Sequence, residues 1–195
     1  MERISHIAAQ EAGDITIPPF MEGKFDDCHL LNISKEERKV FTRIYDEVEK
    51  NGFEYGETIT SEGTIPCYST SNHSVVMNTD AIDERGVKLY HGHTNDTLPS
   101  EKDLSRFIYD NKVEAIGVVT KNKDVFIVTV SDGYIPDIEE FSKIVKNART
   151  VAEHNVLERY NLESLPEKQI EYLIIREKNI EIIRQLGWRI EGGKL

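Results

Sequence analysis

Apolar residues between Ser34 and Gly52 recur at helical spacing, which predicts an amphipathic helix in this stretch. The apolar positions are Val40, Phe41, Ile44, Tyr45 and Val48. Ser34 is suited to be the N-cap, and Glu37, three residues later, completes a capping box. Asn51 followed by Gly52 is typical of a helix C-terminus. The sequence therefore predicts both ends of this first helix.

Beyond Gly52 the pattern changes to short runs of β-branched and aromatic residues separated by turn residues, which is typical of strands. Strands are predicted at residues 53–60, 64–70, 74–78 and 87–93, and as a hairpin at 113–120 and 125–130. Between the fourth strand and the hairpin, Pro99 and Ser100 open a helix that carries Leu104, Phe107 and Ile108, with Ser100 as its N-cap.

Past Pro136 the apolar residues return to helical spacing and predict two amphipathic helices. One begins at Phe141 and extends to about Tyr160; the other follows Pro166 and ends near Gly187. We expect three parts: an extended N-terminal segment at 1–33, a central domain at 34–135, and C-terminal helices at 136–195. The C-terminal helices either complete the core of the same domain or form a homodimer.

Composition and charge exclude several classes of protein. The chain has 195 residues and a formal net charge of −11, whereas binding to nucleic-acid phosphates requires clustered Lys and Arg. No apolar run has the length of a membrane span, and the N-terminus lacks the apolar core of a signal peptide. Cys28 and Cys67 are too few for a disulfide framework. We expect a cytoplasmic protein with reduced thiols, binding neither membrane nor nucleic acid.

The chemistry of the chain is concentrated between His91 and Asp103. Residues two apart on a strand point to one face, roughly 7 Å apart, so His91 and His93 can aim both imidazoles at one ion. Asp103, in the first turn of the following helix, can complete the set. Two nitrogens, one carboxylate and an open position are typical of a catalytic zinc. The alternative is that both histidines are half-buried strand residues and Asp103 only caps its helix.

The motif His91-x-His93 followed by Ser100-x-x-Asp103 resembles the signature of the JAMM (MPN-plus) metalloproteases, a family that includes RadC-like and JAB-like proteins of bacteria and phages. Thr94 stands where the family commonly has proline. The resemblance covers about residues 35–132 and implies an α+β fold of α/β/α layers, with a central mixed sheet flanked by helices and a C-terminal helical extension. It implies a Zn²⁺-dependent hydrolase that cleaves a peptide bond or an isopeptide bond to a ubiquitin-like tail.

The resemblance also implies roles for two further residues. In the family, a glutamate on an upstream strand accepts a proton from the attacking water, and the serine helps to hold the oxyanion, which here would be Ser100. Glu54 is the first candidate for the base, because it lies near Gly56 at the start of a strand. Glu57 is the alternative; strand alternation points it to the opposite face from Glu54, so at most one of the two can face the metal. Glu62, in a predicted turn, is the third.

Two other functions remain compatible with the sequence. One is a catalytically silent, MPN-like scaffold that binds another protein through its C-terminal helices. The other is a domain of a bacterial conflict or phage system that acts on an unknown substrate. A glutamate that reaches the metal-bound site would favour the hydrolase over the scaffold.

Overall fold

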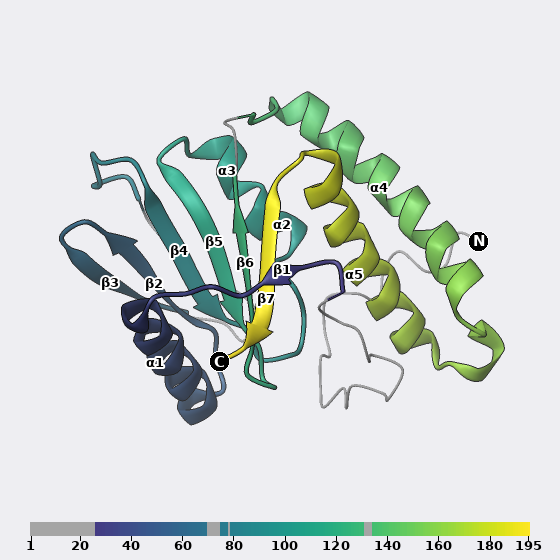
Figure 1. The fold of residues 1–195 in the computed structure, drawn as a ribbon, viewed down its shortest axis with the longest axis horizontal. Helices are drawn as coiled ribbons and strands as arrows, with labels where there is room; N and C mark the ends of the chain where they lie inside the picture. The colour runs from purple at the N-terminus through teal and green to yellow at the C-terminus, as the bar shows by residue number, and fades with distance from the viewer. Residues whose placement is uncertain (1–25, 70–74, 78, 131–133) are drawn as a thin grey trace.

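A seven-stranded mixed β-sheet with helices on both faces forms the body of the molecule (Figure 1). The computed structural model describes residues 26–69, 75–77, 79–130 and 134–195. The helices are α1 (Lys35–Asn51), α2 (Glu101–Leu104), α3 (Arg106–Tyr109), α4 (Ile138–Arg159), the 3₁₀ turn η2 (Leu162–Ser164) and α5 (Glu167–Gln185). The strands are β1 (His29–Leu30), β2 (Tyr55–Thr60), β3 (Gly63–Tyr68), β4 (Val87–Gly92), β5 (Val113–Val119), β6 (Asp124–Thr129) and β7 (Arg189–Lys194).

The strand order is β1-β7-β6-β5-β4-β2-β3. The pairs β4/β5 and β1/β7 are parallel, and the other four pairs are antiparallel. The parallel pair β4/β5 requires a crossover connection, and the segment that contains α2 and α3 supplies it. Strand β4 therefore lies inside the sheet, with β2 on one side and β5 on the other, and its carboxyl end leads directly into the crossover.

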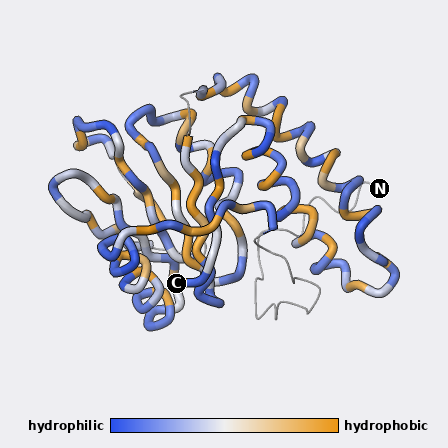
Figure 2. Tube along the Cα trace, viewed as in Figure 1, coloured by the Kyte–Doolittle hydropathy of each residue, from blue (hydrophilic) through white to orange (hydrophobic). Residues whose placement is uncertain are grey.

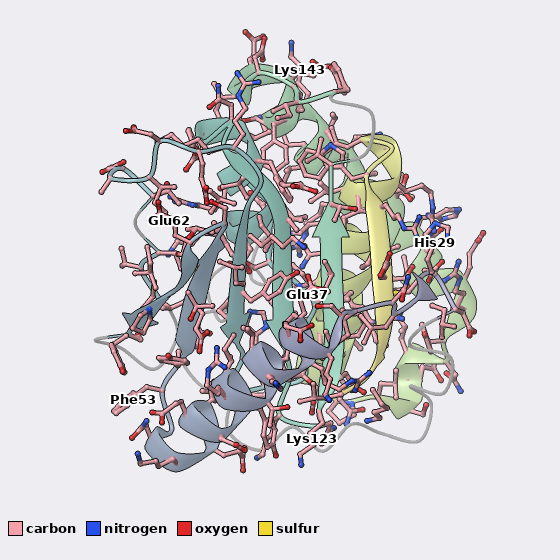
Figure 3. The ribbon with its side chains drawn as sticks, turned by 60° about the vertical axis from the view of Figure 1, so that its left-hand side comes forward. His29, Glu37, Phe53, Glu62, Lys123 and Lys143 are labelled. Atoms are coloured by element: carbon pink, nitrogen blue, oxygen red, sulfur yellow. The ribbon has the colours of Figure 1, made fainter. Side chains whose placement is uncertain are left out.

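Helix α1 covers one face of the sheet. Its apolar side, Phe41 and Ile44 in particular, is fully buried against the sheet. The ring of Phe41 stacks on that of Tyr90 in β4, with 4.5 Å between the ring centroids. The Tyr90 hydroxyl and the Lys88 ammonium both donate hydrogen bonds to Glu37 Oε1 at 2.8 Å. Figure 3 shows Glu37 on the helix, where it overlies the strands. These contacts fix strand β4 from one side.

The opposite face of the sheet packs against α3, α4 and α5, which contribute Phe107, Phe141 and Ile183 to a single apolar cluster. Figure 2 shows apolar residues concentrated on the central strands and on the sides of the helices that face them. Trp188 is buried, packs edge-on against Phe107 and donates a hydrogen bond to the Tyr134 carbonyl at 3.0 Å. The C-terminal helices thus share a core with the sheet.

Most of the predicted elements are present, with three differences. Residues 75–77 do not belong to any strand, although a strand was predicted at 74–78; residues 74 and 78 lie outside the described part of the chain. The predicted helix after Ser100 is divided at Ser105 into α2 and α3. Strand β7 was not predicted, because Gly192 and Gly193 have low β-propensity. It forms through pairing with β6 and β1, and a Cβ at Gly193 would lie only 2.9 Å from the Leu31 Cβ.

Of the predicted N-terminal segment, residues 1–25 lie outside the described part of the chain. His29 and Leu30 form the short strand β1 at the edge of the sheet.

Candidate metal centre

Strand β4 brings His91 and His93 to the same face of the sheet, away from α1. His91 pairs with Gly56 of β2 on one side and Val118 of β5 on the other. The backbone N–H of His93, just after the strand, donates to the Val119 carbonyl at 2.9 Å. Both side chains are buried, with 4% and 6% of each residue exposed. A Cβ at Gly56 would lie 2.9 Å from the Tyr90 carbonyl oxygen and 3.1 Å from the His91 Cβ, so the close approach of β2 to β4 beside His91 requires glycine.

The two imidazoles meet through their Nε2 atoms, which are 2.9 Å apart. Asp103 completes the cluster, because its Oδ1 is 3.5 Å from His91 Nε2 and its Oδ2 is 3.8 Å from His93 Nε2. One ligand atom from each of the three residues lies within 4.8 Å of the other two. The structure therefore brings together the three residues that the sequence singled out as metal ligands.

The position of Asp103 follows from the start of α2. Ser100 is the N-cap, and its hydroxyl accepts a hydrogen bond from the Asp103 N–H at 3.2 Å. In return, Asp103 Oδ2 accepts from both the backbone N–H and the hydroxyl of Ser100, each at 2.7 Å. This reciprocal capping box leaves Oδ1 directed at His91. Capping and ligation are thus compatible roles for the same carboxylate.

Thr97 fixes the tautomer of His93. The Thr97 hydroxyl donates to Asn95 Oδ1 at 2.5 Å, so its single proton is engaged. The His93 Nδ1 lies 2.8 Å from that hydroxyl and 2.9 Å from the Thr97 carbonyl. Both neighbours act as acceptors, which places the proton on Nδ1 and leaves Nε2 to face the cluster. A donor-to-carbonyl contact of this kind orients metal-binding histidines in general. No sequence pattern indicates this role of Thr97, which arises from the geometry of the turn.

Helix α5 holds the loop between His93 and Ser100 from outside. The Tyr172 hydroxyl donates to the Asp96 carbonyl at 2.6 Å, and Asn179 Nδ2 donates to the Pro99 carbonyl at 3.0 Å. Asn179 is buried, with 2% of the residue exposed. Since these partners are about 80 residues apart in the sequence, only the fold reveals that α5 supports the histidine loop.

Charge interactions among the three candidate ligands shift the pKa values of Asp103 and His93. Burial acts to raise the pKa of Asp103, but the neighbouring His91 and His93 outweigh it and hold that pKa well below its usual value. Burial likewise acts to lower the pKa of His93, but the Asp103 carboxylate outweighs it and raises that pKa. Asp103 is consequently an anion at neutral pH. An anionic oxygen and two imidazole nitrogens form a donor set that suits a divalent transition-metal ion.

The three candidate glutamates occupy different places. Glu54 precedes β2 and lies near enough to His93 for its charge to contribute to the raised pKa of that histidine. Glu57 is on the α1 face, where it is paired with Tyr90 across the sheet and accepts hydrogen bonds from Arg43 at 3.0 and 2.6 Å. The predicted alternation is therefore confirmed for Glu57, which points away from the histidines.

Glu62 lies in the turn between β2 and β3, six residues from Gly56. At about 3.3 Å per residue, that is roughly 20 Å along the strand. Figure 3 shows Glu62 near the end of this hairpin. Of the three glutamates, Glu54 is thus the one whose charge raises the pKa of a residue in the ligand cluster.

Comparisons of the chain with protein-family models, with curated proteins and with solved structures find no match. Among the described residues, no helix combines the length and the apolar character needed to cross a lipid bilayer. The case for a function therefore depends on the geometry of the His91–His93–Asp103 cluster.

Proposed function

We propose that the chain is a zinc-dependent hydrolase that cleaves an amide bond, in a peptide or an isopeptide, by direct addition of water. The observation that carries the proposal is the convergence of His91, His93 and Asp103, whose ligand atoms lie within 4.8 Å of one another. Ligands at Zn–N distances of 2.0–2.1 Å in a tetrahedral site lie about 3.3 Å apart. The separations of 2.9, 3.5 and 3.8 Å are close to that value.

Three protein ligands leave one tetrahedral position open, as in catalytic rather than structural zinc sites. A zinc ion bound there would polarise a carbonyl group and lower the pKa of a coordinated water from about 15.7 toward 7. The burial of both histidines supports the proposal, because hydrogen-bonded and buried ligands are held in one orientation. The arrangement also agrees with the resemblance of the motif to the JAMM metalloproteases of bacteria and phages.

Glu54 is proposed as the general base. Its carboxylate would accept a proton from the attacking water and return it to the departing amine. Ser100 would donate a hydrogen bond to the oxyanion, which requires its hydroxyl to turn away from Asp103 Oδ2, its present acceptor. In this proposal the two histidines and Asp103 hold the ion, Glu54 transfers the proton, and Ser100 stabilises the negative charge of the oxyanion.

A pair of isosteric variants tests the proposal. Zinc content and hydrolysis of a library of fluorescence-quenched peptides and isopeptides are measured for wild type, Glu54→Gln and Glu57→Gln. We expect Glu54→Gln to keep its zinc and to lose roughly 10²–10⁴-fold in rate, the usual contribution of a general base. Glu57→Gln is the matched control, because Glu57 faces α1 and not the cluster. Even if Glu57→Gln lowers the stability of the protein, the molecules that remain folded should cleave at the wild-type rate. Equal rates in wild type and Glu54→Gln would contradict the assignment.

A second candidate function is a catalytically silent, zinc-binding scaffold. It is favoured by one observation: the Ser100 hydroxyl already donates to Asp103, so it is engaged in a structural hydrogen bond. Its partner would be another protein or a second copy of the chain, bound at α4, where Leu157 is 62% exposed. The same library separates the candidates, because the scaffold would bind zinc and cleave no member of it.

A reducing compartment such as the cytoplasm suits this proposal. Cys67 is buried and Cys28 half-buried, and both are free thiols. Burial raises the pKa of Cys28 to about 11, which keeps the thiol protonated and unreactive.

A further inference from the structure

A small pocket opens beside the candidate metal centre, and His91 and Asp103 form part of its wall. Its volume is about 160 Å³. Pockets for drug-sized ligands measure roughly 300–1,000 Å³, and a water molecule in the liquid takes about 30 Å³. The pocket therefore has room for about five waters or one side chain, directly next to the atoms that would hold the ion.

One side of the pocket is apolar. Leu89 and Ile116 pair across β4 and β5 on the same face as His91, and each is 1% exposed. Met77, 8% exposed, and Val76, 77% exposed, form the adjoining wall. Because the Val76 side chain is exposed to water, a ligand that packs against it would bury apolar surface. Short aliphatic carbons fit this side of the pocket.

The other side carries two cations from α2 and α3. Lys102, in α2, and Arg106, the first residue of α3, both line the pocket. Arg106 is held in position, because its Nη2 donates to the Met77 carbonyl at 3.0 Å. In the described residues, neither cation forms an ion pair with an acidic side chain, unlike Lys178, which pairs with Glu101 at 2.9 Å. Two cations without acidic partners are notable in a chain of net charge −11.

We infer that this pocket selects an acidic residue on the acyl side of the scissile bond, an aspartyl or glutamyl group. The methylenes of that residue would lie on Val76 and Met77, above the buried Leu89 and Ile116, and its carboxylate would meet Lys102 and Arg106. Arginine binds carboxylates through charge-assisted hydrogen bonds in a fixed geometry. This inference rests on the proposed function, since it names the substrate class of the same site. Lys102 and Arg106 are specificity residues; the reaction itself depends on the metal ligands and Glu54.

Two probes that differ in one group test the inference by binding. Glutaric acid monohydroxamate carries a free carboxylate, and its amide counterpart is neutral; the hydroxamate end of each chelates zinc. Dissociation constants for the zinc-loaded protein are measured by calorimetry. We expect the acid to bind at least about tenfold more tightly than the amide, as one charge-assisted contact provides. The preference should disappear in Lys102→Gln/Arg106→Gln and be reduced in Lys102→Gln alone, which changes only an exposed side chain.

Lys143→Gln is the matched control, because Lys143 is exposed on α4 (Figure 3) and pairs with Glu139, away from the pocket. It should keep the full preference for the acid. Equal affinity of the two probes for wild type, or an unchanged preference in the double variant, would overturn the inference.

A metal-free titration separates this inference from the proposed function. Glutarate and glutaramide are added to the zinc-free protein, and the backbone amide signals of residues 101–109 are followed by NMR. Glutarate should shift these signals more than glutaramide does, whether or not the chain takes up zinc. Equal shifts would refute the anion pocket even if the protein is a zinc hydrolase. Failure to bind zinc, with a glutarate-specific shift, would refute only the proposed function.

Discussion

The Ser100 hydroxyl donates to Asp103 Oδ2 at 2.7 Å, and the same hydroxyl accepts from the Asp103 N–H at 3.2 Å. One side chain thus caps a helix and orients a candidate metal ligand. Ser100→Ala removes both interactions, so we expect a loss of about 1 kcal/mol in stability and a roughly tenfold weaker affinity for zinc. Chemical denaturation and a competitive zinc titration measure the two effects. Zinc affinity equal to that of wild type would show that the capping box does not position Asp103.

The ion pair between Glu57 and Arg43 should affect stability and not metal binding. The Glu57 side chain is 3% exposed and that of Arg43 is 52% exposed. Arg43→Met leaves a buried carboxylate with the Tyr55 hydroxyl, at 3.3 Å, as its remaining side-chain donor. Breaking a fully buried pair costs about 3–5 kcal/mol; because Arg43 is half exposed, we expect about 2 kcal/mol. Urea denaturation checks the loss, and unchanged zinc content in the folded fraction checks the specificity.

The Glu37 cluster predicts a pH dependence of stability. Burial acts to raise the pKa of Glu37, but hydrogen bonds from Lys88, Ser34 and Tyr90 outweigh it and lower the pKa from 4.5 to about 2. Because the pKa in the folded state is depressed, the charged carboxylate stabilises the fold fully above about pH 4.5. That contribution is lost as the pH falls through about 2.

Glu37→Gln should therefore lower the free energy of unfolding by roughly 1–2 kcal/mol at pH 7 and by less as the pH falls from 4.5 toward 2. Glu36→Gln is the control, because it removes the same charge from an exposed neighbouring position. Denaturation curves across this pH range give the comparison. A difference between wild type and Glu37→Gln that does not change with pH would argue against the charged network.

The sequence was sufficient to predict the parts of the site that depend on local pattern. Strand alternation placed His91 and His93 on one face and put Glu54 and Glu57 on opposite faces, and the capping pattern located Ser100 and Asp103 at a helix start. These features follow from spacings of two and three residues, which backbone geometry fixes. The same holds for α1, whose capping box and C-terminal glycine were both visible in the sequence.

What could not be predicted depends on contacts between distant segments. Strand β7 forms because β6 and β1 pair with its glycine-containing backbone, although its own residues do not favour a strand. The support that Tyr172 and Asn179 give to the histidine loop arises from how α5 packs. That Lys102 and Arg106 line a pocket beside the cluster could not be predicted, because its wall also includes residues of β4 and β5. In each case the partner is remote in the chain.

The proposed function depends on metal binding by the His91–His93–Asp103 cluster, and elemental analysis measures that binding. Wild type, His91→Ala/His93→Ala and His154→Ala are purified, loaded with zinc and dialysed. The last is a control, because the His154 side chain is 70% exposed and pairs with Glu158. We predict about one zinc ion per chain in wild type and in His154→Ala, and none in the folded double variant. Wild-type protein without zinc, or a double variant that retains it, would show that these residues do not form a zinc site.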